Sequence, residues 1–260
     1  MTNVAIKATF PYRAGTALRT IAGYGALATA HAKAFLGKPS PKEQQINNAL
    51  TGYPSNHIYR IRHNALIPSL QLYERQWKVT RLWPYTLDSF LDIGCCKGYY
   101  TCLAAQKPTC RVAVGVDVDH AFVRTSQQVS DYLGLSNTRF HQTTLDQLAD
   151  RPSDFDGPFQ TVLLIGTYHY LFWGSSTSDH CFKNHTEILS RLAALCTDRV
   201  IISGRFELDR LPKSIKTAAL QTKEAEQYNT RIFIKAAETF FTVQSKGFLG
   251  TYPLFVMLKK

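Results

Sequence analysis

The sequence predicts an α/β fold in which helices cover both faces of a doubly wound, mostly parallel sheet. Between residues 90 and 203, apolar segments of strand length alternate with segments of helical length, a pattern typical of parallel sheets. A strand, a turn with two glycines and a helix follow one another at 90–105, and two strand-like segments at 240–258 predict a C-terminal antiparallel hairpin. We therefore expect a seven-stranded sheet in residues 86–260, preceded by a helical N-terminal extension in residues 1–85 that serves as a lid or acceptor platform.

The N-terminal extension is expected to consist of helices. An Ala-rich segment at 18–36 has a helical composition, and the prolines within 38–41 end it and start the next helix. We expect a short helix at 43–51 and a helix or helix pair at 57–82, kinked near Pro68.

The sheet and its helices follow in order along the rest of the chain. Strands are expected at 90–93, 111–117, 138–141, 159–166, 199–203, 240–245 and 251–258. Helices are expected directly after Gly98 and at 119–133, 184–196 and 222–239. The connections include a loop at 144–146, turns at 151–158 and 246–247, and an aromatic segment at 167–173.

The composition indicates a globular chain with one large domain. The chain has 260 residues, of which 45% are hydrophobic. Its six cysteines show no paired spacing, which favours reduced thiols and a cytoplasmic protein. The absence of a long uncharged apolar run excludes a membrane-spanning helix. Residues 1–42 contain no acid and resemble an organelle-targeting segment, and the alternative is a helix that packs on the domain or lines its cleft.

The basic charge is concentrated at the N-terminus. The formal net charge is +11, and residues 1–89 hold eleven Lys or Arg residues against three acids. This distribution indicates an anionic partner, such as RNA, a phosphorylated or carboxylated substrate, or a membrane surface, or else a solvated face without a partner. The segments 59–63 and 73–78 mix aromatic residues with cations, which suits stacking on a nucleic acid or covering a neighbouring core.

The glycine spacing at the first turn argues against two common nucleotide sites. A dinucleotide site has glycines in the order G-x-G-x-x-G, but here Cys96 and Tyr99 stand at the second and third glycine positions after Gly94. The phosphate-binding pattern G-x-x-x-x-G-K-[ST] is also absent.

Residues 90–98, Phe-Leu-Asp-Ile-Gly-Cys-Cys-Lys-Gly, resemble the first motif of the class I S-adenosylmethionine-dependent methyltransferases. That motif runs hydrophobic-Leu-Asp-hydrophobic-Gly-x-Gly-x-Gly, and the resemblance extends over about 90–260. The chain departs from it at Cys96, where the family has glycine. If the loop keeps the family's backbone, Cys96 has a positive φ, which costs a residue with a side chain about 1 kcal/mol.

The resemblance implies that S-adenosylmethionine is the cofactor. Asp117 ends the second strand, and its carboxylate would accept hydrogen bonds from the two ribose hydroxyls, while the alternative is an acid that caps the next helix. Asp92 would orient the loop or the cofactor's ammonium group. Thr144 and Leu145 would meet the adenine. The remaining cofactor contacts that the resemblance implies are Gly94, Cys96, Gly98, Gly166 and Thr167.

The resemblance also suggests an acceptor side beyond the fourth strand. A neutral His169 could take the proton of a hydroxyl or amine nucleophile, and the alternative is a histidine that only orients a loop. Tyr168, Tyr170 and Trp173 could form the wall of an acceptor pocket near the sulfonium, or they could pack in the core. Arg205, after the fifth strand, borders the expected pocket and would contact the substrate.

The leading hypothesis is a methyltransferase that uses S-adenosylmethionine to methylate an oxygen or nitrogen nucleophile of a small or medium-sized acceptor. One alternative is an RNA methyltransferase, acting on tRNA or rRNA through the basic N-terminal third, and another is a non-catalytic binding protein with the same fold. The residues His180, Cys181 and His185 lack a further close ligand pair, so we expect no metal. Nothing in the sequence indicates an oligomeric state.

Overall fold

The computed structural model describes residues 38–52, 54, 58–176, 178 and 180–260. The helix expected at 18–36 lies outside the described residues. No helix in the described part is long and apolar enough to cross a membrane.

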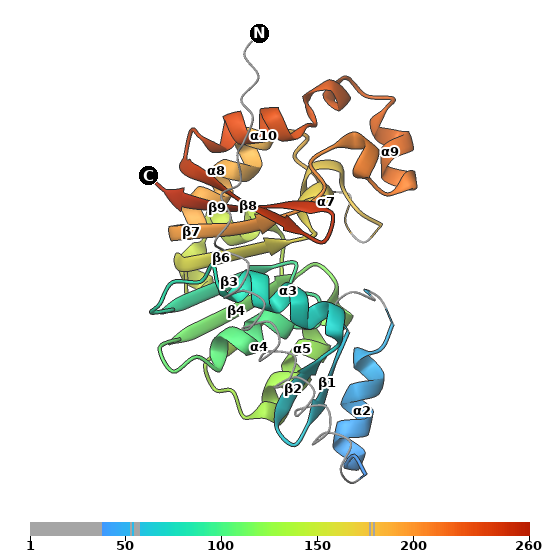
Figure 1. Cartoon of the computed structure of the whole chain (residues 1–260), viewed down its shortest axis with the longest axis vertical. Coiled ribbons are helices and arrows are strands. Elements are labelled where there is room, and N and C mark those ends of the chain that lie inside the picture. The colour runs from blue at the N-terminus through green and yellow to red at the C-terminus, as the bar shows by residue number, and fades with distance from the viewer. Residues whose placement is uncertain (1–37, 53, 55–57, 177, 179) are drawn as a thin grey trace, which may run out of the picture.

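Seven strands form one sheet in the order β5-β4-β3-β6-β7-β9-β8 (Figure 1). The first five strands in this order pair in parallel, and β9 runs antiparallel to both β7 and β8. This arrangement confirms the predicted fold class, including the C-terminal hairpin. The strands are β3 Ser89–Ile93, β4 Val112–Asp117, β5 Thr138–Gln142, β6 Phe159–Ile165, β7 Cys196–Ser203, β8 Phe241–Leu249 and β9 Tyr252–Lys259.

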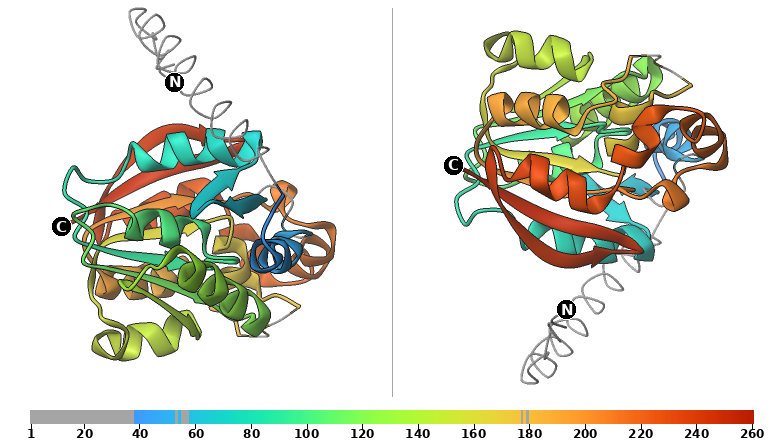
Figure 2. Two further views of the ribbon diagram at one scale, coloured as in Figure 1. Left: turned by 90° about the horizontal axis from the view of Figure 1, so that it is seen from below. Right: turned by 90° about the horizontal axis from the view of Figure 1, so that it is seen from above.

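Helices cover both faces of this sheet (Figure 2) because successive strand residues point to opposite sides. Leu91 of β3 belongs to one apolar cluster together with Leu192 and Phe233. Phe90, its neighbour in sequence, belongs to the opposite cluster together with Leu72. The helices are α2 Pro41–Leu50, α3 Leu70–Thr80, α4 Tyr99–Ala105, α5 His120–Leu133, α6 Leu145–Asp150, α7 Tyr168–Trp173, α8 His185–Leu195, α9 Lys213–Ala219 and α10 Thr230–Ala237.

The prediction of a helix over 57–68 is wrong. Strands β1 Tyr59–Arg62 and β2 Ala65–Pro68 form a separate antiparallel hairpin, and the helix α3 begins only after the N-cap Ser69. The connecting residues His63 and Asn64 have φ angles of 48° and 57°, and a two-residue hairpin turn of type I′ requires positive φ at both positions. The short alternation of apolar and cationic residues in β1, Tyr-Arg-Ile-Arg, is therefore a strand pattern.

Three smaller predictions also differ from the structure. The loop expected at 144–146 begins α6, because Thr144 and Gln147 form a reciprocal capping box. The single helix expected at 222–239 is divided into the 3-10 turn η4 Lys223–Gln227 and α10, which starts at the N-cap Asn229. The turn between β8 and β9 lies at Gly250 and Thr251 instead of 246–247. Two further 3-10 turns, η2 Pro152–Phe155 and η3 Leu208–Arg210, lie in connections.

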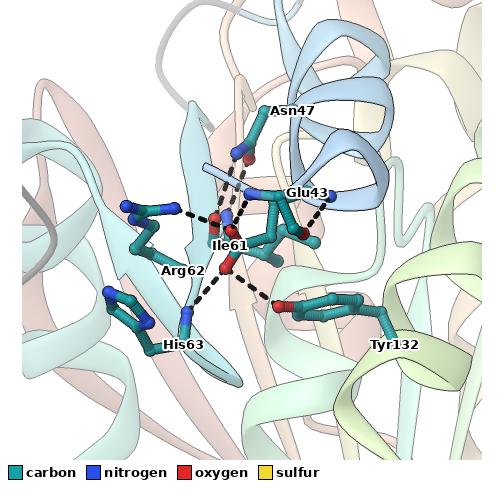
Figure 3. Close-up of polar contacts among 7 residues, drawn as sticks. Glu43, Asn47, Ile61, Arg62, His63 and Tyr132 are labelled. Carbon is teal, nitrogen blue, oxygen red and sulfur yellow. Dashed lines mark hydrogen bonds and ion pairs between the residues drawn. The ribbon is translucent and has the colours of Figure 1, made fainter. Parts of the chain in front are cut away.

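A buried carboxylate joins α2, the β1–β2 hairpin and α5 (Figure 3). Glu43 is 3% exposed and pairs with Arg62 at 2.7 Å, and it accepts hydrogen bonds from the backbone N–H groups of Ser40 and His63 at 2.8 Å each and from Tyr132 Oη at 2.9 Å. Burial raises the pKa of the carboxyl, but the hydrogen bonds from Ser40, His63, Tyr132 and Arg62 outweigh it and lower the pKa to about 2. This ionised group is thus one of the contacts that hold the N-terminal extension on the sheet domain.

Candidate functional site

A cavity of about 760 Å³ opens at the carboxyl ends of the parallel strands. The chain order reverses there, with β4 on one side of β3 and β6 on the other, and such a switch point is where open α/β sheets bind ligands. Nine predicted site residues line the cavity: Gly94, Cys96, Asp117, Thr144, Leu145, Gly166, Thr167, Tyr170 and Arg205. Five others lie outside its wall: Asp92, Gly98, Tyr168, His169 and Trp173.

The loop after β3 takes a left-handed backbone at every second residue. Gly94, Cys96 and Gly98 have φ angles of 72°, 52° and 74°, so the positive φ expected at Cys96 is confirmed. A side chain at Gly94 would clash with Thr167, and one at Gly98 would lie 2.8 Å from Ser126. Glycine is therefore required at both positions on grounds of space as well as conformation.

Asp117 projects from the end of β4 into the cavity wall. Its Oδ2 accepts a hydrogen bond from the Cys96 N–H at 2.9 Å, and its Oδ1 accepts one from the Asp119 N–H at 3.0 Å. Burial raises the pKa of this carboxyl, and the two N–H groups act against that shift. Among the described residues Asp117 forms no ion pair, and each oxygen keeps a second lone pair that can accept a hydroxyl donor.

Asp92 lies behind the glycine loop. Its carboxyl is 4% exposed, and Oδ2 accepts a hydrogen bond from Thr101 Oγ1 at 3.4 Å. Burial, together with the nearby charge of Asp117, raises the pKa of Asp92 to about 7. The position agrees with a role in orienting the loop.

Leu145 and Gly166 form an apolar part and an open part of the wall. Leu145 is buried at the start of α6, and Thr144 caps that helix by accepting a hydrogen bond from the Gln147 N–H at 3.4 Å. On the other side, Gly166 follows β6 with a φ of 76°, and no atom lies within 4 Å of the position a Cβ would take. A ligand can therefore approach the Gly166 backbone closely.

The helix α7 divides the predicted aromatic residues between cavity and core. Tyr170 lines the cavity. Tyr168 is fully buried, and its hydroxyl lies 2.5 Å from Nδ1 of His185, while Trp173 packs against Phe172 with ring centroids 4.7 Å apart. Tyr168 and Trp173 thus have the packing role that was the alternative to a pocket wall.

His169 and Arg205 form a pair. The His169 ring is 1% exposed, and its Nε2 lies 3.1 Å from Nη1 of Arg205. Because a guanidinium has only donors, Nε2 accepts and Nδ1 carries the ring proton, although Nδ1 has no hydrogen-bond partner in the described part of the chain. Burial, with the Arg205 charge, lowers the pKa of His169 to about 3, so the ring is neutral near pH 7. The only acceptor nitrogen of His169 is therefore occupied.

Several cavity residues were not anticipated from the sequence. Arg75 comes from α3, Tyr252 from the start of β9, and Pro54 from the segment after α2. His180 also lines the cavity, and its Nε2 is paired with Asp146 Oδ2, while the other oxygen of Asp146 is paired with Arg191. No sequence pattern predicts that these residues line the cavity, because their positions depend on how separate elements pack together.

The aromatic and basic segments considered for nucleic acid are partly used inside the fold, while Arg60, His63 and Lys78 are exposed. Tyr59 is 1% exposed and its hydroxyl bonds to the Lys97 carbonyl, and Arg62 is paired with Glu43. Arg81 lies over the Trp77 ring, 4.3 Å from its centroid. Within the described residues, no group of three or more His, Cys, Asp or Glu side chains could hold a metal ion.

Comparison with solved structures finds similar folds at low sequence identity. The crystal structure of EvdMO1 is 13% identical with a TM-score of 0.54, and the match covers 83% of this chain and 46% of that one. An O-methyltransferase family protein from Burkholderia thailandensis is 15% identical with a TM-score of 0.51 and coverages of 73% and 57%. The bifunctional kinase-methyltransferase WbdD is 14% identical with a TM-score of 0.50 and coverages of 72% and 38%. The chain spans less than two thirds of each of these proteins, and the likeness shows the fold alone.

Comparison at the level of sequence identifies the family. The comparison with curated proteins finds no matching sequence. A family profile described as a methyltransferase domain matches residues 87–244, which is more than half of the chain. Together with the parallel sheet, the glycine loop and the acid at the end of β4, this match shows that the chain belongs to the class I S-adenosylmethionine-dependent methyltransferases.

Proposed function

We propose that this protein binds S-adenosylmethionine in the cavity and transfers its methyl group to an oxygen or nitrogen nucleophile of a small or medium-sized acceptor. The observation that carries the proposal is Asp117, a carboxylate held at the switch point by two backbone N–H groups, with lone pairs still available toward the cavity.

The chain's residues fit this cofactor at several points. Asp117 suits two vicinal ribose hydroxyls, because each carboxylate oxygen can accept one further hydrogen bond. Leu145 and Phe122 give the same part of the cavity an apolar lining suited to a purine ring. The open space beside Gly166 lets the methionine part approach the backbone. The carboxylate of Asp117 makes this region favourable for a cationic ligand.

When bound, S-adenosylmethionine supplies a methyl group on a positively charged sulfur. The chain's own task is then to position an acceptor and remove its proton, because orientation provides much of the rate of such a transfer. His180 lines the cavity with its Nε2 held by Asp146, the residue that follows Leu145, and this contact puts it on the purine side of the cavity, away from the acceptor. His169 remains a predicted catalytic residue, but its occupied Nε2 supports a role in holding Arg205.

Cofactor binding is tested by calorimetric titration of the purified protein with S-adenosylhomocysteine, the demethylated product. Asp117→Asn replaces one acceptor oxygen by a donor, and we expect it to weaken binding by at least tenfold. The matched control is Asp150→Asn, at an exposed position at the end of α6, and it should leave the affinity unchanged. Failure of the unmodified protein to bind would overturn the proposal.

The acceptor class is tested by transfer of a labelled methyl group. Small hydroxyl and amine compounds are offered in one set of reactions and bulk tRNA and rRNA in another. Labelling of the small compounds with none of the RNA is the expected result. Labelling of RNA alone would favour the alternative that the basic N-terminal third suggests.

A further inference from the structure

Arg205 presents a fixed guanidinium in the cavity wall. The residue follows β7 and is partly buried. Its Nη1 donates to His169 Nε2 at 3.1 Å and its Nε donates to Tyr252 Oη at 2.9 Å. The guanidinium carbon also lies 5.1 Å from the centroid of the Tyr252 ring. The side chain is thus held from two directions.

The positive charge of this group is not neutralised by either neighbour. Neither His169 nor Tyr252 is a carboxylate, and Arg205 forms no ion pair with any described residue. Glu207, the nearest acid along the chain, accepts a hydrogen bond from the Thr230 N–H at 3.0 Å at the start of α10. An arginine has five N–H donors, of which two are used here, so three have no partner among the described residues.

The strand order places Arg205 away from the nucleoside part of the cavity. Asp117 ends β4, and β7 stands three strand spacings further along the sheet, which is roughly 14 Å at about 4.8 Å per spacing. The methionine arm of S-adenosylmethionine is a short chain of single bonds that reaches roughly 8 Å from the ribose ring when extended. Arg205 therefore lies beyond the nucleoside part of the cavity, at the end where the methionine arm and the acceptor meet.

We infer that Arg205 binds a carboxylate group of the methyl acceptor, and that His169 and Tyr252 are positioning residues that orient its guanidinium fork. The inference rests on the proposed function and narrows its substrate to anionic acceptors. A carboxylate is the group that fits best, because a planar guanidinium pairs with it through two parallel N–H bonds. The basic charge of the chain acts in the same direction by attracting anions.

The test measures acceptor binding separately from cofactor binding. The protein is first saturated with S-adenosylhomocysteine and then titrated with paired compounds that differ in one group, namely hydroxy- and aminobenzoates and the corresponding benzamides. We expect the acids to bind at least tenfold more tightly than the amides. Arg205→Gln should abolish this preference and leave the affinity for S-adenosylhomocysteine within twofold of the original.

Control variants separate the effect of the oriented Arg205 guanidinium from the effect of the protein's overall positive charge. Arg210→Gln removes an equal charge from an exposed position five residues away and should keep the preference for acids. Tyr252→Phe should reduce the preference by several-fold, since it removes only one of the two hydrogen bonds that hold the fork.

The outcomes distinguish this inference from the proposed function. If S-adenosylhomocysteine itself does not bind, the proposed function fails. If it binds but the acids and amides bind equally, or neither set binds, the carboxylate assignment is wrong. A loss of S-adenosylhomocysteine affinity of more than tenfold in Arg205→Gln would place the guanidinium on the cofactor carboxylate and overturn the inference as well.

Discussion

Tyr132 on α5 donates a hydrogen bond of 2.9 Å to Glu43 on α2, although the two residues are 89 positions apart in the chain. The same carboxylate pairs with Arg62 of the β1–β2 hairpin. The N-terminal extension also supplies Pro54 and Arg75 to the cavity wall. This buried acid therefore helps to couple the sheet domain to the elements that border one side of the candidate site.

Replacing Glu43 should destabilise the protein strongly. Glu43→Ala removes the carboxylate that faces the buried Arg62 guanidinium, and we expect a loss of about 3 kcal/mol in the free energy of unfolding, measured by urea denaturation. Tyr132→Phe removes one hydrogen bond and should cost about 1 kcal/mol. If Glu43→Ala costs no more than Tyr132→Phe, the ion pair contributes nothing to the fold.

The contribution of Glu43 should depend on pH in a defined direction. Its folded-state pKa, about 2, is below the unfolded value near 4.3, so its stabilising effect is complete above that unfolded value and is lost as the pH falls toward 2. After allowing for screening by solvent, the effect is about 2 kcal/mol. The difference in unfolding free energy between the unmodified protein and Glu43→Gln should therefore shrink between pH 5 and pH 2.

Asp92 should show the opposite dependence. Its folded-state pKa of about 7 lies above the unfolded value near 3.9, so the folded state binds more protons between these values and stability falls as the pH rises. Asp92→Asn removes this penalty and should be more stable than the unmodified protein by roughly 4 kcal/mol at pH 8, with no gain at pH 4. Thermal unfolding at the two pH values measures it. An equal effect at both values would mean that Asp92 is ionised in the fold throughout.

Cys96 should tolerate glycine better than valine. The left-handed backbone suits glycine, so Cys96→Gly gains about 1 kcal/mol from relieved strain and loses a similar amount with the buried thiol. Valine resembles cysteine in size, but its branched Cβ fits poorly at positive φ. We expect Cys96→Val to lose about 2 kcal/mol of stability and at least tenfold in S-adenosylhomocysteine affinity. A valine variant with unchanged stability and binding would show that the loop can take another conformation.

The sheet could be predicted from the sequence because its inner strands are buried on both faces. Segments such as residues 162–165 are apolar throughout, and short apolar runs of this kind that alternate with helical segments indicate the buried strands of a parallel sheet. The hairpin of β1 and β2 was missed because four alternating residues are too few to outweigh helix-forming neighbours. Its decisive feature, positive φ at His63 and Asn64, appears only in the folded backbone.

The candidate site was predictable to the extent that strand ends define it. Asp117 and Gly166 follow strands whose carboxyl ends meet at one edge, so their proximity follows from the fold. The sequence of α7 does not show which of its aromatic residues face the core. Residues two positions apart on a helix point to different sides, and here Tyr168 points to the core and Tyr170 to the cavity. Tyr252 comes from an element distant in sequence, and only packing brings it to Arg205.

The roles of the two histidines near the cavity can be separated by kinetics on the best acceptor found. His180→Asn changes only the purine side of the cavity, so we expect it to raise KM for the cofactor several-fold with kcat within threefold of the original. His169→Asn keeps an acceptor oxygen for Arg205, and it should raise KM for the acceptor several-fold with kcat within threefold of the original. His169→Leu, which removes that acceptor, should raise KM further. A fall in kcat of about 100-fold or more for His169→Asn, the size typical of a lost general base, would restore His169 as the base. The pH dependence of kcat is an independent check. Burial lowers the pKa of His169 to about 3, so if His169 were the base, its titration would cause no change in kcat between pH 5 and pH 8.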